Sequence, residues 1–195
     1  MNNSGASTRF EEFYRHEVQA VYRFVYSRVG NHEDALEIVQ ESFLALYQLQ
    51  QNNEAGEHER ALLFRLARNR AIDLLRRRRT RETFGQEAAT GKVLLFRAAE
   101  TRTPPMPPTP EDILLDKERR HWATMALAQL SERDQECLAL RCSGLSYREV
   151  AEALRLNPNS VGQIINRALR RFAESYEALQ GKKQNDEKTG KTGRE

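Results

Sequence analysis

Cysteine is scarce in this chain of 195 residues, which contains only Cys137 and Cys142. Neither has another cysteine or a histidine at metal-ligand spacing, and on a helix two residues five positions apart point in different directions. The sequence therefore predicts no metal site. We expect both cysteines to be reduced and to pack as small apolar side chains.

Long apolar runs are also missing. No stretch approaches the ~18 apolar residues of a membrane span, and the first residues, MNNSGASTRFEEF, contain no apolar signal core. We therefore expect no membrane insertion and a cytoplasmic location.

Signatures of catalysis are absent as well. The four histidines are dispersed, and the chain has no glycine-rich phosphate loop, nucleophile elbow or paired-carboxylate motif. The sequence therefore predicts neither an enzyme nor a bound cofactor.

Charge is plentiful and unevenly placed. The net charge is only +3, with a pI near 9.0, but arginines crowd the segment 60–81, where Asp73 is the single acidic residue. A local excess of this size favours a polyanionic partner.

Helical periodicity dominates both ends of the chain, so we predict an all-α fold of two small helical domains. Glycine and asparagine at 30–31 should break the first helix, and the prolines of TRTPPMPPTP exclude helix from a tether between the domains. The expected domains are 9–80 and 111–179, with a flexible linker at 81–110 and a disordered tail at 180–195. The helices are expected at about 9–29, 32–49, 60–79, 111–129, 132–142, 146–154 and 158–178.

The linker contains one apolar segment, KVLLFRAAE at 92–100. It suits either a short helix or an apolar anchor for a partner's groove. On the second expected helix, 32–49, we place Leu36, Val39 and Phe43 on the inward face.

The segment SYREVAEALRLNPNSVGQIINRALRRF, at 146–172, predicts a helix-turn-helix. Ser146 and Glu149 form a capping box, and Asn157 followed by Pro158 suits the start of a second helix. The polar face of that second helix carries side chains suited to base edges and phosphates. These candidate DNA-reading residues are Asn159, Ser160, Gln163, Asn166, Arg167 and Arg170.

The helix expected at 60–79 carries an arginine stripe. Arg65, Arg68 and Arg76 recur at steps that place them on one face, and a merely solvated face would be expected to offer acidic partners four residues away. Only Asp73 offers one, so the stripe indicates a surface that follows phosphates.

Two blocks in order give a specific resemblance. HEDALEIVQESFLALYQ with RALLFRLARNRAIDLLRRRR resembles region 2 of bacterial RNA polymerase sigma factors of the extracytoplasmic-function group. LSERDQECLALRCSGLSYREVAEALRLNPNSVGQIINRALRRF is similar to region 4 of the same proteins. The resemblance implies a transcription initiation factor whose partners are core RNA polymerase, promoter DNA and an anti-sigma factor or other regulator.

The resemblance also implies roles for individual residues. Glu37, Gln40 and Glu41 match the surface that docks on polymerase. The helix from 158 onward matches the reader of the upstream-thirty-five element. The residues that match the upstream-ten element and melting surface are Asn52, Asn53, Glu54, Glu57, Arg65, Arg68, Asn69, Asp73, Arg76 and Arg77.

Some positions depart from the family pattern. Leu62 and Glu59 stand where aromatic residues are usual, and Gly162 and Ile164 stand where basic residues are usual. The rival interpretation is a helix-turn-helix regulator that acts without replacing the sigma subunit. That class predicts an upstream ligand or phosphoacceptor domain, whereas residues 9–80 have a helical pattern.

Overall fold

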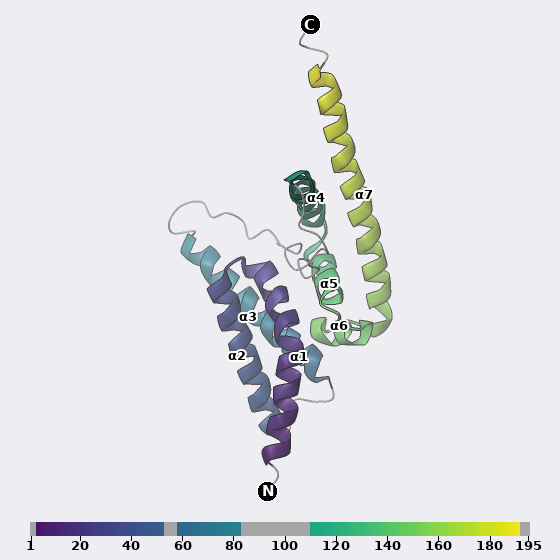
Figure 1. Cartoon of the computed structure of the whole chain (residues 1–195). Helices are drawn as coiled ribbons and strands as arrows, with labels where there is room; N and C mark the ends of the chain where they lie inside the picture. The colour runs from purple at the N-terminus through teal and green to yellow at the C-terminus, as the bar shows by residue number, and fades with distance from the viewer. Residues whose placement is uncertain (1–2, 53–57, 83–109, 192–195) are drawn as a thin grey trace.

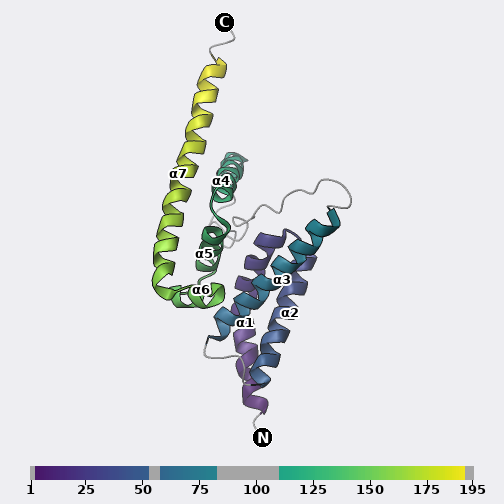
Figure 2. The ribbon, with the colours of Figure 1, turned by 180° about the vertical axis from the view of Figure 1, so that it is seen from behind.

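The computed structural model describes residues 3–52, 58–82 and 110–191, and in these ranges it contains helices and no strand. The predicted all-α fold with two helical domains is confirmed, and Figures 1 and 2 show the two groups of helices from opposite sides. The helices are α1 Asn3–Val29, α2 His32–Gln51, α3 Glu59–Glu82, α4 Pro110–Ala128, α5 Glu132–Cys142, α6 Tyr147–Leu154 and α7 Pro158–Lys191.

The first module comprises α1, α2 and α3, which pack side by side (Figure 1). Gly30 ends α1 with a φ of 69°, and the side chain of Asn31 caps α2 by accepting from the backbone N–H of Asp34. Phe24 and Phe64 meet edge to face in the buried centre, with ring centroids 5.2 Å apart. This core fixes which face of α2 and of α3 remains outside.

The second module comprises α4 to α7. Ser131 caps α5, and the α6–α7 pair packs on α5 through Leu140, Val150 and Val161, all fully buried. Helix α7 also lies along α4, and its C-terminal part extends beyond the rest of the module (Figure 2).

Helix α7 continues to Lys191, beyond position 178, where the sequence pattern ends that helix. A helix already nucleated by packing needs no new nucleus to lengthen, and Lys, Gln and Glu of the tail are good helix formers. The apolar segment 92–100 lies outside the described residues.

Candidate nucleic-acid and protein-binding surfaces

Helix α2 presents a mixed polar and apolar ridge to solvent. Glu37, Gln40 and Glu41 are all exposed, as the polar face of the sequence pattern predicts. Leu36 was expected to face inward, but 49% of it is exposed, and Leu44 is 56% exposed. Ile38 takes the buried position instead, at 5% exposure.

The two exposed leucines lie one turn before and one turn after Gln40. Exposed apolar side chains within a polar surface are typical of protein-binding faces, because they bury well against a partner. We call Leu36, Glu37, Gln40, Glu41 and Leu44 the α2 ridge. Glu41 is already engaged within the module, since Arg70 Nε donates to its carboxylate at 3.1 Å.

The segment after α2 is described only at its edges. Asn52 forms the exposed C-cap of α2, whereas Asn53, Glu54 and Glu57 lie outside the described residues. Glu59, at the start of α3, accepts a hydrogen bond from Arg9 at 3.0 Å. Leu62 lies in the core with 8% exposure, so the position where an aromatic residue is usual contributes here to packing.

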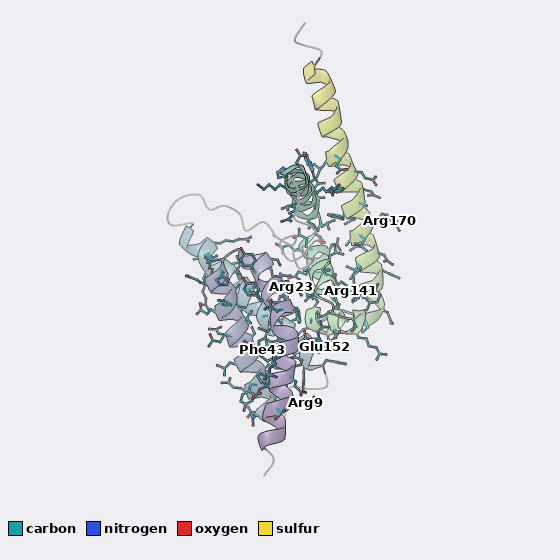
Figure 3. All side chains as sticks on the ribbon, in the orientation of Figure 1. Arg9, Arg23, Phe43, Arg141, Glu152 and Arg170 are labelled. Atoms are coloured by element: carbon teal, nitrogen blue, oxygen red, sulfur yellow. The ribbon has the colours of Figure 1, made fainter. Side chains whose placement is uncertain are left out.

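The arginine stripe of α3 divides into two parts. Towards the C-terminus of the helix, Arg76 and Arg77 are exposed, together with Asn69 and Asp73. Towards the N-terminus, the arginines are paired with acidic residues of the second module. Figure 3 places Glu152 of α6 close to the first module.

Glu136 of α5 holds the tightest of these pairs. Arg68 donates to both carboxylate oxygens, from Nε at 2.7 Å and from Nη2 at 2.8 Å. Arg28 of α1 donates to the same carboxylate at 3.3 Å and lies over the Phe24 ring. Burial lowers the pKa of Arg28, the Glu136 carboxylate opposes that shift and Arg68 adds to it.

Arg60 joins the modules at the other end of α3. Its Nε donates to Glu17 at 2.8 Å, while Nη1 and Nη2 donate to the carbonyl oxygens of Gly144 and Ser143 at 2.9 and 3.1 Å. Gly144 has a φ of 88°, and a Cβ there would lie 3.3 Å from Arg60 Nη2. The turn before α6 therefore favours glycine both for its backbone and for the approach of Arg60.

The predicted helix-turn-helix is present as α6 and α7. The capping box at Ser146 and Glu149 is complete, with both reciprocal hydrogen bonds formed. Arg155 ends α6 in the left-handed conformation, and the Asn157 side chain accepts from the backbone N–H of Asn159. These caps fix a tight turn between the two helices.

The polar face of α7 remains accessible. Asn159, Gln163 and Asn166 are exposed and Ser160 is half-buried. Arg170 projects away from the second module in Figure 3. Exposed amide side chains on the first turns of such a helix can form the paired hydrogen bonds that distinguish bases.

Arg167 differs from the other candidate readers because it has a carboxylate partner. Its Nη2 donates to Oδ1 of Asp134 at 3.1 Å, and Arg171 Nη1 lies 3.6 Å from Oδ2. Asp134 is completely buried. Ile164, at a position where a basic residue is usual, is buried in the core at 8% exposure.

Two further surveys bear on function. Among the described residues, no group of three or more histidine, cysteine, aspartate or glutamate side chains is arranged to hold a metal ion. In the same part of the chain, every helix is too short or too polar to traverse a bilayer.

The fold and these surfaces define a two-module helical protein that contains a helix-turn-helix. Residues 13–81 match the family model of sigma-70 region 2, and residues 120–172 match that of sigma-70 region 4. The two matches together span more than half of the chain, which therefore belongs to the sigma-70 family.

Two curated relatives are extracytoplasmic-function RNA polymerase sigma factors. BldN of Streptomyces coelicolor is 30% identical over 87% of this chain and 61% of its own length. SigE of Mycolicibacterium smegmatis is 28% identical over 85% of this chain and 60% of its own length. The chain thus spans about three fifths of the length of the curated relatives that it matches.

Two solved structures share the fold. CnrH, in complex with the cytosolic domain of CnrY, is 21% identical, with a TM-score of 0.59, covering 90% of this chain and 92% of CnrH. The sigma factor RpoE from Bartonella quintana, in complex with the anti-sigma factor NepR, is 20% identical, with a TM-score of 0.61. That match covers 87% of this chain and 97% of RpoE.

Sequence reasoning missed residues that join the two modules, Glu136 and Arg28 among them. The partners of the Arg68–Glu136 pair are separated by 68 positions, and no local pattern carries such a pairing. The exposed leucines of the α2 ridge were detectable in principle. Leu36, Gln40 and Leu44 recur every four residues, which places them on one face.

Proposed function

We propose that this chain is a transcription initiation factor that binds core RNA polymerase, directs it to promoter DNA and helps to open the duplex. It acts in the cytoplasm and contributes no catalysis of its own. The observation that carries the proposal is the presence of both sigma-70 regions, in order, in one chain. Two exposed surfaces are available for this activity. One is the α2 ridge, and the other is the polar face of α7 that carries Asn159, Gln163 and Asn166.

Docking is assigned to the α2 ridge. Its exposed leucines supply apolar area, while Glu37 and Gln40 supply polar contacts that fix the orientation of the partner. Glu37 is the cleaner site for a test, because Glu41 already pairs with Arg70 and its replacement would also disturb the first module.

Opening is assigned to the segment after α2 and to the arginine helix. Asn52, Asn53, Glu54 and Glu57 accept hydrogen bonds from a base that has left the stack, and the α3 surface follows the backbone of the released strand. Unstacking a base costs a few kcal/mol, which these contacts must offset. On α3 the residues assigned to this role are Arg65, Arg68, Asn69, Asp73, Arg76 and Arg77.

Reading of the upstream-thirty-five element is assigned to α7. Asn159, Ser160 and Gln163 lie nearest its N-terminus, the end that enters the major groove most deeply in a helix-turn-helix. Asn166, Arg167 and Arg170 follow along the groove. The Asp134 partner holds Arg167 in place, which reduces the side-chain entropy that it would lose on binding a phosphate.

A regulator that masks these surfaces is part of the proposal. The two solved structures compared above are complexes, one of RpoE with the anti-sigma factor NepR and one of CnrH with the cytosolic domain of CnrY. We infer that this chain has an anti-sigma factor or an equivalent partner.

The test is run-off transcription with reconstituted polymerase, followed by sequencing of the transcript starts. Core enzyme with this chain should initiate at discrete promoters, whereas core enzyme alone should not. Glu37→Lys should weaken binding to core polymerase with an unchanged circular dichroism spectrum. Glu12→Lys, the same charge change at an exposed position on α1, is the matched control.

Two results would contradict the proposal. Specific binding to a duplex promoter with no need for core polymerase would instead support the helix-turn-helix regulator. Equal core binding by wild type, Glu37→Lys and Glu12→Lys would remove the docking role from the α2 ridge.

A further inference from the structure

The contact between the two modules contains a set of ion pairs whose polarity runs in one direction, beside the apolar residues of one continuous buried cluster and the hydrogen bonds of Arg60 to two carbonyl oxygens. Every ion pair described across it joins an arginine of the first module to a glutamate of the second. These pairs are Arg28–Glu136, Arg68–Glu136, Arg60–Glu149 and Arg65–Glu152. We call them the intermodule clasp.

The basic side of the clasp overlaps the surface assigned to DNA opening. Arg65 and Arg68 point at Glu152 and Glu136, at 3.5 and 2.7 Å. The Glu136 carboxylate accepts two parallel hydrogen bonds from Arg68, the geometry in which a guanidinium also binds phosphate. The Glu136 carboxylate therefore takes up the same two N–H donors of Arg68 that a phosphate would use.

We propose that the clasp is an autoinhibitory contact, through which the isolated chain closes on itself and withholds Arg65 and Arg68 from single-stranded DNA. Its relevance to promoter opening rests on the proposed function. The closure itself rests only on contacts within this chain, and it requires no partner protein. Separation of the modules would release both arginines together.

Glu136 is the central residue of the clasp. Its side chain is 15% exposed, it pairs with two arginines from two different helices, and one of them, Arg28, is itself only 13% exposed. Loss of the Glu136 charge leaves Arg28 close to Arg68 with no carboxylate between them. Both arginines belong to the first module and stay close, but separation of the modules lets water solvate Arg28 and screen the repulsion, so neutralisation of Glu136 should favour the open form.

Part of the clasp is accessible to solvent. Glu152 is half exposed, and a groove of about 580 Å³ remains between α3 and α5, lined by Arg68, Arg76 and Glu136 among others. A partly exposed ion pair such as Arg65–Glu152 is individually weak and is screened by salt, whereas the pairs of Glu136 are more deeply buried. A core-polymerase surface or a DNA strand can therefore compete with the clasp.

The experiment compares Glu136→Gln with Glu132→Gln in the full-length protein. Glu132 lies one turn earlier on α5 and is exposed, so both variants make the same charge change on the same helix. Small-angle X-ray scattering measures the radius of gyration. Fluorescence anisotropy measures affinity for a mixed-sequence single-stranded oligonucleotide of about 20 nucleotides.

We expect Glu136→Gln to have a larger radius of gyration than wild type. It should also bind the oligonucleotide about tenfold more tightly, because Arg65 and Arg68 can then both reach phosphates. Glu132→Gln should match wild type in both measurements. Raising the salt concentration should enlarge wild type and leave Glu136→Gln unchanged, since its clasp is already open.

Equal radii for Glu136→Gln and Glu132→Gln at low salt would overturn the proposal, and so would tighter DNA binding without expansion. If circular dichroism shows that Glu136→Gln does not fold, Glu152→Gln is tested in its place. This variant removes the partner of Arg65 and should likewise increase the radius of gyration and the affinity for the oligonucleotide. Failure of the proposed function can be distinguished from failure of the clasp. It would appear as a lack of promoter-specific transcription, while Glu136→Gln would still have a larger radius of gyration than Glu132→Gln.

Discussion

Arg155 occupies the most strained backbone position in the helix-turn-helix, and its replacement by glycine should stabilise the second module. Its φ and ψ are 54° and 46°, and it is the one non-glycine residue with positive φ in the described part of the chain. The turn requires this conformation, because the N–H of Leu156 donates back to the carbonyl of Ala151 at 2.8 Å, the six-to-one bond of a Schellman motif.

The magnitude follows from two opposing costs. An L-residue in the left-handed region costs roughly 1–2 kcal/mol. Glycine avoids that cost but loses more backbone entropy on folding, about 0.5–1 kcal/mol. Since the Arg155 side chain is exposed, little packing is lost with it. Arg155→Gly should therefore raise the free energy of unfolding by about 0.5–1 kcal/mol.

The assay is urea denaturation followed by fluorescence of Trp122. This is the only tryptophan of the chain and lies half-buried on α4, so it reports on the second module. Arg155→Gly should move the midpoint upward with an unchanged slope. Arg155→Ala is the control, because it removes the side chain but keeps the Cβ that causes the strain.

Two outcomes would refute this reasoning. Equal stabilisation by Ala and Gly would show that the arginine side chain, rather than its backbone conformation, is unfavourable. A loss of stability in Arg155→Gly would show that the side chain makes a contact worth more than the strain.

Three further predictions concern the second module. Gln163→Ala should change base preference in selections from a randomised upstream element, by about 1–3 kcal/mol at the contacted base pair. Arg170→Ala should instead weaken binding to all sites alike and reduce the slope of log affinity against log salt concentration by about one. A change of base preference in Arg170→Ala but not in Gln163→Ala would exchange the two roles. Ser146→Ala breaks the capping box and should lower the free energy of unfolding by about 1 kcal/mol, measured by the same denaturation, and an unchanged midpoint would contradict the importance of the cap. Burial raises the pKa of Cys137 to about 11 and also raises the pKa of Cys142, but only the Cys142 side chain is exposed. Ellman's reagent should therefore react with Cys142 first and with Cys137 only when the protein unfolds, and equal reaction rates for the two thiols would contradict the burial of Cys137.

The same pKa shift has a consequence for stability. The folded state holds the Cys137 proton more tightly than the unfolded state, in which the pKa is near its ordinary value of 9.0. The stabilisation from this group is therefore complete below the ordinary pKa of 9.0 and is lost as the pH rises towards about 11.

Local chemistry in the sequence determined the helices and their caps. Ser131, Ser146 and Asn31 accept hydrogen bonds from backbone N–H groups three residues later, and such short-range contacts are written directly in residue order. The exposed polar face of α7 was predictable for the same reason, because the 3.6-residue period separates Gln163 from Val161 and Ile165. The prediction for Leu36 failed because periodicity alone does not fix the width of the buried face.

Only the tertiary structure decided which charged side chains form ion pairs with one another. The arginines of α3 find few acidic partners at helical spacing, which in the sequence indicates an unpaired basic stripe. In the structure, Arg65 and Arg68 pair with Glu152 and Glu136, and Asp134 holds Arg167. Coulomb attraction depends on distance in space and on burial rather than on separation along the chain. The sequence by itself thus determined which surfaces are basic. Only the packing of the two modules decided which of those arginines form ion pairs with carboxylates.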